Sequence, residues 1–121
     1  MSVLRMVEFW ARLEGLITSN KVIIDRPKGS SNPRYPECIY PPDYGYIENT
    51  SGGDGNEIDV WRGSKLGTKL VGIVCTVDIT KGDAEFKLLI NCTNSEINKV
   101  SQFHNNEHMS AIVIKRRQIL L

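Results

Sequence analysis

Hydrophobic and polar positions alternate with two different periods along this chain of 121 residues, one typical of helices and one typical of strands. Over residues 2–18, apolar side chains recur every three or four positions, which predicts an amphipathic helix. A second helix is predicted from Thr93 to about His104, because Thr93 and Glu96 have the spacing of a capping box. The region between these helices has the patterns of strands.

Short strand-like segments fill that region and follow the second helix. They lie at 21–25, from 39–40 onward, and at 58–62, 70–77, 85–92 and 110–115. The segment 70–77 is apolar on both faces, which predicts an interior strand. In 85–92, Phe86 and Cys92 are expected on one face, with Glu85 and Lys87 on the other. About six short strands and two terminal helices predict an α+β, mainly β protein built on a small closed or nearly closed barrel.

The length of the chain fits a single domain, 1–121, with a core that needs no disulfide or structural metal. We divide it into an N-terminal helix (1–20), a barrel core (21–92), and a helix with the last strand (93–121). The apolar N-terminal helix is expected to pack on the domain. A subunit contact, and thus a homo-oligomer, is the alternative.

Charge and cysteine content narrow the classes of function. A net charge of +1 argues against nucleic acid or an anionic membrane as a general partner. No apolar run approaches the ~18 residues of a membrane span. The three cysteines form no Cys-x-x-Cys pair, which favours free thiols in a reducing compartment. We therefore expect a cytoplasmic protein.

The stretch from Tyr40 to Trp61 contains the candidate chemistry. It begins with prolines and tyrosines, passes through a glycine-rich turn, and contains the acids Asp54 and Asp59. Asp59 falls on the strand face opposite its apolar neighbours, while Asp54 lies in the turn before it. Two carboxylates aimed at one point are ligands that Mg²⁺ prefers. A turn with solvated acids is the alternative reading.

A basic loop precedes this stretch. Arg26, Lys28 and Arg34 lie in a segment rich in Gly, Ser and Pro, whose backbone amides are free of regular structure. Guanidinium groups and amides together can hold a phosphate, although a solvated basic loop is at least as common.

The motif Tyr40-Pro-x-x-Tyr-Gly-Tyr-Ile, followed by Asp54-Gly-x-x-x-Asp-Val, resembles the signature of the soluble family I inorganic pyrophosphatases. The resemblance covers roughly residues 22–90. It implies an OB-like barrel of about five or six strands, a magnesium cofactor, and inorganic pyrophosphate as the substrate that is hydrolysed to two phosphates.

The resemblance also implies roles for individual residues. Metal ligands would be Asp54, Asp59, Glu85 and one of Asp78 or Asp83. Phosphate-binding residues, including those of the basic loop, would be Arg26, Arg34, Tyr40, Tyr44 and Lys87. Residues close to the attacking water would be Asp59, Tyr44, Asn56 and Glu57.

This sequence departs from the family pattern at Asn56. The family has an aspartate there, which orients or deprotonates the attacking water. An amide can orient a water but cannot accept its proton, and Glu57 is the nearest acid that could replace it. We therefore predict an inorganic diphosphatase weakened by Asn56. The alternative is a non-catalytic protein of the same fold that binds magnesium and a phosphate ligand.

Overall fold

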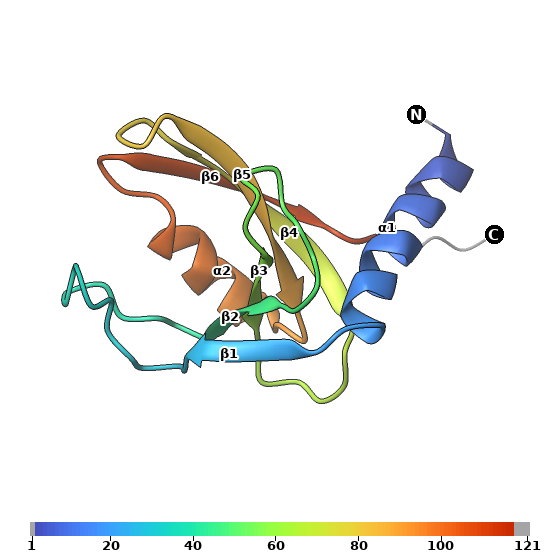
Figure 1. Ribbon diagram of the computed structural model, residues 1–121, viewed down its shortest axis with the longest axis horizontal. Coiled ribbons are helices and arrows are strands. Elements are labelled where there is room, and N and C mark those ends of the chain that lie inside the picture. The colour runs from blue at the N-terminus through green and yellow to red at the C-terminus, as the bar shows by residue number, and fades with distance from the viewer. Residues whose placement is uncertain (1, 118–121) are drawn as a thin grey trace.

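A computed structural model describes residues 2–117, and Met1 and residues 118–121 of the last predicted segment lie outside the described residues. Figure 1 shows the order of the elements along the chain. They are α1 (Val3–Thr18), β1 (Val22–Arg26), β2 (Asp43–Ile47), β3 (Ile58–Arg62), β4 (Leu70–Asp78), β5 (Asp83–Ile90), α2 (Asn94–Phe103) and β6 (Met109–Lys115).

The strands form one mixed sheet in the order β1-β2-β3-β5-β4-β6. All neighbours are antiparallel except β3 and β5, which run parallel. The prediction of a mainly β protein with two flanking helices is confirmed. Closure into a barrel is not shown, because β1 and β6 lie at opposite edges and no pairing joins them within residues 2–117.

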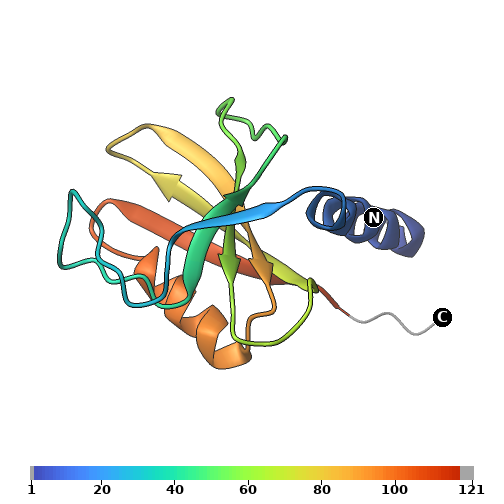
Figure 2. The same ribbon diagram turned by 60° about the horizontal axis from the view of Figure 1, so that its bottom comes forward.

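Each face of the sheet packs against one helix, and Figures 1 and 2 show α1 and α2 in separate places around it. The first apolar cluster joins Trp10, Leu13 and Ile17 of α1 to one face of the sheet. The second joins Ile97 and Val100 of α2 to the other face. Side chains alternate along each strand, so neighbouring residues of β3 enter different clusters.

Two details of the predicted strands are wrong. β2 begins at Asp43 rather than near residue 39, because Pro41 and Pro42 have no N–H to donate to a ladder. β5 ends at Ile90, and Asn91 takes a left-handed φ of 53°. The chain therefore turns, and Cys92 packs in the cluster of α2 instead of sharing a face with Phe86.

The ends of the helices are fixed by local hydrogen bonds. Thr93 and Glu96 form the predicted capping box at the start of α2. After α2, the side-chain amide of Asn105 accepts from the N–H of Ala111 and donates to its C=O. The side chain of Asn106 accepts from the N–H of Met109, and the backbone N–H of Asn106 donates to the C=O of Met109. These bonds cover the free edge of β6 over its first half, which reduces its capacity to pair with another strand.

One surface of the sheet stays apolar and uncovered. Val77, Phe86, Ile112 and Ile114 are between 42% and 66% exposed, and the strand register places them side by side on the α1 face. The first turns of α1 also expose apolar residues, including Leu4. No helix within residues 2–117 is long and apolar enough to cross a membrane.

Candidate active site

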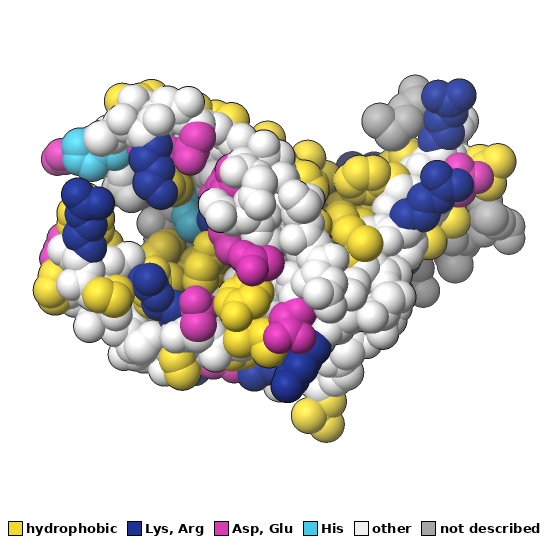
Figure 3. Space-filling view, in the orientation of Figure 1, with side chains coloured by type: hydrophobic (Ala, Val, Ile, Leu, Met, Phe, Trp, Pro, Cys, Tyr) yellow, Lys and Arg dark blue, Asp and Glu magenta, His cyan; other side chains and the backbone are white. Residues whose placement is uncertain are grey.

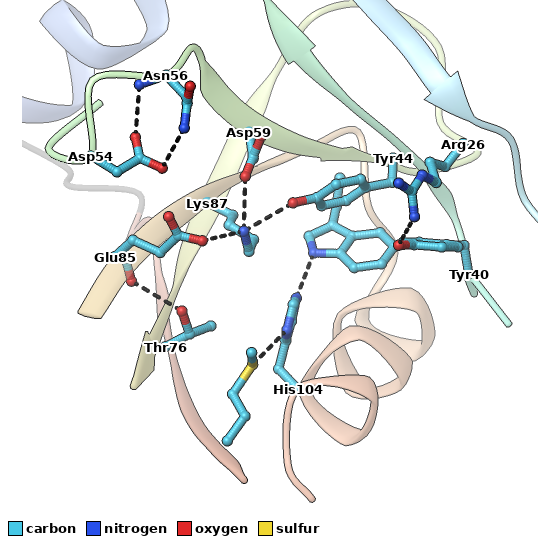
Figure 4. Close-up of polar contacts among 12 residues, drawn as sticks. Arg26, Tyr40, Tyr44, Asp54, Asn56, Asp59, Thr76, Glu85, Lys87 and His104 are labelled. Atoms are coloured by element: carbon cyan, nitrogen blue, oxygen red, sulfur yellow. Dashed lines mark hydrogen bonds and ion pairs between the residues drawn. The ribbon is translucent and has the colours of Figure 1, made fainter. Parts of the chain in front are cut away.

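Four polar side chains meet on the α2 face of the sheet (Figure 4). Tyr44 comes from β2, Asp59 from β3, and Glu85 and Lys87 from β5. The parallel pairing of β3 with β5 brings Asp59 beside Lys87, and alternation along β5 puts Glu85 on the same face. We call these four residues the Lys87 cluster.

The ammonium of Lys87 is the centre of this cluster. Its Nζ donates to the hydroxyl of Tyr44 at 2.9 Å, to Oδ2 of Asp59 at 2.9 Å, and to Oε1 of Glu85 at 2.6 Å. An ammonium has three donors, so all of them are used. Burial alone would lower the pKa of Lys87, but the surrounding oxygens outweigh it and raise that pKa above its usual range. Burial raises the pKa of Tyr44, which stays a neutral phenol.

The aromatic rings of Trp61 and His104 pack next to the Lys87 cluster, where Trp61 contacts Tyr44. The rings of Tyr44 and Trp61 lie edge to face with centroids 4.5 Å apart. The indole Nε1 of Trp61 donates to Nε2 of His104 at 3.0 Å, so that nitrogen carries no proton. Nδ1 of His104 then holds the proton and lies 3.2 Å from the sulfur of Met109. Burial, and to a smaller extent the positive charge of Lys87, lower the pKa of His104 to about 3.

The buried His104 predicts an acid-sensitive fold. Its pKa is lower in the folded chain than the usual 6.5, so the unfolded chain binds the proton first as the pH falls. The stability it confers is complete above pH 6.5 and is lost as the pH falls towards 3, at up to ~1.4 kcal/mol per pH unit.

Urea unfolding of His104→Gln between pH 7 and pH 4 should therefore show a flatter dependence of the free energy of unfolding on pH than the native chain. His108→Gln is the control, because the side chain of His108 is exposed and takes no part in the contacts of His104. Equal slopes for the two variants would contradict the role of His104.

Arg26 and Tyr40 extend the site along β1 and the segment before β2. The hydroxyl of Tyr40 accepts from Nη1 of Arg26 at 2.7 Å and from Nδ2 of Asn32 at 3.1 Å. Its ring lies 5.4 Å from that of Tyr44. Arg34 lies farther out on the loop, where its guanidinium covers the ring of Tyr35. Figure 3 shows a hollow on this side of the molecule, with Lys and Arg side chains around its opening.

The loop acids lie outside the Lys87 cluster. Asp54 is exposed, and its carboxylate accepts from the backbone N–H of Asn56 at 3.0 Å and from its Nδ2 at 3.4 Å. These bonds, led by the one from the backbone of Asn56, lower the pKa of Asp54. Glu57 is also exposed. The amide of Asn56 therefore orients Asp54 in this structure.

Asp78 and Asp83 face each other at the end of the β4–β5 hairpin. The carboxylate of Asp78 accepts from the N–H groups of Thr80 and Lys81 at 2.9 and 3.0 Å, so it closes the turn. Asp83 alternates along β5 with Glu85 and thus lies on the face of the cluster. The geometry favours Asp83 over Asp78 as an additional acid for the site.

The donor set fits magnesium only in part. Within residues 2–117, no three His, Cys, Asp or Glu side chains come together as a metal site. Among the acids of residues 2–117, Asp59 and Glu85 are the two that form ion pairs with Lys87, which lies between them. Magnesium is nevertheless often held by one or two carboxylates together with phosphate oxygens and waters, and the two acids provide that minimum.

Sequence reasoning missed the pair formed by Trp61 and His104. Strand alternation places Trp61 on the same face of β3 as Asp59. No local pattern, however, links Trp61 to a histidine 43 residues away. The only signal was the position of His104 at the end of the predicted helix.

Comparisons with known proteins agree with this fold. No family model matches the chain. The inorganic pyrophosphatase of Leifsonia xyli subsp. xyli is 30% identical over a 92-residue alignment, which covers 57% of this chain and 56% of the relative. The chain thus spans about half the length of the curated relative that it matches.

Solved structures give the same result for the fold. The inorganic pyrophosphatase of Helicobacter pylori matches with a TM-score of 0.54 and 17% identity, over 78% of this chain and 81% of that one. That of Coxiella burnetii matches with a TM-score of 0.56 and 14% identity, over 78% and 84%. The resemblance to the family I inorganic pyrophosphatases is confirmed: the chain has their fold and is a shorter, divergent relative.

Proposed function

We propose that this chain hydrolyses inorganic pyrophosphate to two phosphates with magnesium and a metal-activated water. The observation that supports this most strongly is the convergence of two carboxylates, a buried ammonium and a phenol on one face of a pyrophosphatase fold. Carboxylates can hold the cation, and the ammonium and phenol can bind phosphate oxygens. Asp59 and Glu85 are the proposed metal ligands in the cluster, with Asp54 and Asp83 as outer ones.

Magnesium, when bound, would neutralise phosphoryl oxygens and lower the pKa of its water. The chain's own residues would position the substrate. Lys87 and Tyr44 would bind one phosphate, and Arg26 and Tyr40, which already contact each other, would bind the other side. Arg34 would approach from the loop. Each of these groups is a donor, as a substrate with several negative oxygens requires.

A magnesium and phosphate binding protein without turnover is the second candidate. It is favoured by one observation: the amide of Asn56 bonds Asp54 and cannot accept a proton from water. Glu57, exposed beside it, is the alternative acceptor that would keep the chain active.

Asn56→Asp separates the two candidates. If the missing carboxylate limits turnover, the variant should release phosphate from pyrophosphate about 10²-fold faster than the native chain, which is the usual size of a general-base effect. Phosphate release is measured with and without magnesium, and Asn98→Asp on the exposed side of α2 is the matched control. Equal and rapid release by the native chain and both variants would show that Asn56 is not limiting. No release from any of them would rule out the diphosphatase activity.

We also propose a cytoplasmic homo-oligomer. Cys38, Cys75 and Cys92 are free thiols, which supports a reducing compartment. The uncovered apolar face that includes Phe86 and Ile112 supports contact with a second copy. Sedimentation at several concentrations would test this association, and a monomer throughout would rule it out.

A further inference from the structure

The Lys87 ammonium occupies the point between Asp59 and Glu85 towards which a cation would be drawn. We propose that Lys87 acts as an internal cation that weakens magnesium binding until a phosphate ligand draws the ammonium away, so that metal and phosphate bind cooperatively. This inference rests on the proposed function, which assigns magnesium and phosphate to this site.

The contacts of Lys87 support the first half of the inference. Its three donors are all engaged, at 2.6–2.9 Å, and only 5% of the residue is exposed. The side chains of Asp59 and Glu85 are 33% and 28% exposed, so solvent reaches their outer oxygens. A metal that binds those oxygens would lie close to the ammonium, and the two positive charges would repel each other.

The charges of the cluster lead to the same conclusion. Asp59 and Glu85 contribute two negative charges, and Lys87 cancels one of them. Asp54 and Asp83 lie outside this ion-paired group, because neither contacts Lys87 and Asp54 is exposed and bonded to Asn56. Magnesium gives up its waters reluctantly, so a site with a net charge of −1 should bind it weakly.

A phosphate ligand changes both the position of the Lys87 ammonium and the negative charge that is available to magnesium. Its oxygens offer Lys87 short charge-assisted hydrogen bonds, which compete with those from the two carboxylates. Once the ammonium turns to the phosphate, Asp59 and Glu85 are free, and the phosphate oxygens complete the coordination of the metal. Because coupling between two ligands is reciprocal, magnesium should strengthen phosphate binding by the same factor.

Calorimetric titration of magnesium tests the inference, with and without imidodiphosphate as a pyrophosphate analogue that resists hydrolysis. For the native chain, we expect weak magnesium binding alone and at least about tenfold tighter binding with the analogue. Lys87→Met should bind magnesium alone at least about tenfold more tightly than the native chain, although it loses the phosphate contact. Lys87→Arg keeps the positive charge, and its binding of magnesium alone should stay as weak as that of the native chain.

Lys87→Gln is a second neutral variant that keeps a hydrogen-bond donor near the carboxylates and should fold even if the Met variant does not. Circular dichroism and thermal unfolding verify the fold of each variant. Neutral variants that bind magnesium alone no more tightly than the native chain would overturn the inference, as would a native chain whose magnesium affinity the analogue does not change. Either result leaves the proposed activity intact if native pyrophosphate hydrolysis needs magnesium. Conversely, cooperative binding without hydrolysis would support the inference and exclude the diphosphatase.

Discussion

Asp59→Asn is expected to reduce magnesium-dependent phosphate release from pyrophosphate by at least about 10²-fold. Asp59 lies on β3, flanked by buried Ile58 and Val60, so its carboxylate is held in place at the Lys87 cluster. An amide has no charge to offer magnesium, and it removes one of the two carboxylates that balance the ammonium. Losing a fixed group that stabilises transition-state charge commonly costs 10²–10³-fold.

Initial rates at saturating magnesium measure the effect, and calorimetry with imidodiphosphate shows whether magnesium binding is lost with them. Glu107→Gln is the control, since Glu107 is exposed in the turn after α2 and contributes to none of the contacts of the cluster. A native rate in Asp59→Asn would remove Asp59 from the metal site and point to the loop acids instead.

The composition of the site could be predicted where it depends on strand alternation. Period-two alternation places Asp59 opposite Ile58 and Val60, and it places Glu85 and Lys87 on one face of β5, as the structure shows. The capping box at Thr93 is equally local. These features follow from neighbouring residues alone, so no knowledge of the rest of the fold is needed.

The assembly of the site depends on strand order, which a single sequence does not provide. Asp59 and Lys87 are 28 residues apart in the sequence. They meet because β5 lies between β3 and β4 in the sheet and runs parallel to β3. A sequence reader would join β3 directly to β4, the next strand along the chain. The same limit applies to Tyr44, whose bond to Lys87 spans 43 residues.

The loop between β2 and β3 shows a different limit. Asp54 and Asp59 are predicted to aim at one point, but Asp54 bonds Asn56 two residues later. Short side chains in turns bond the nearby backbone readily, and this local geometry competes with a shared site. Binding of magnesium and phosphate would have to overcome these bonds to recruit Asp54.

Gly45→Ala is expected to lower the free energy of unfolding by at least about 3 kcal/mol or to prevent folding. A Cβ at this position would overlap the carbonyl oxygen of Ile23 and come within 2.8 Å of its carbon and 2.9 Å of Cα of Ile24. These atoms belong to the backbone of β1, which is paired with Gly45 through Ile24. They cannot move away unless the β1–β2 ladder opens, and Tyr44 of the candidate site lies next to Gly45 in that ladder.

Urea unfolding followed by tryptophan fluorescence measures this change, because Trp61 is fully buried. Gly15→Ala is the matched control. Its Cβ would meet nothing within 4 Å, and alanine in a helix interior should stabilise the chain by about 0.5–1 kcal/mol. The two Gly→Ala substitutions should thus change the free energy of unfolding in opposite directions. At Gly15, alanine reduces the backbone entropy that the chain loses on folding, whereas at Gly45 it forces two strands apart. A Gly45→Ala variant as stable as the native chain would mean that β1 does not lie against β2 at this register.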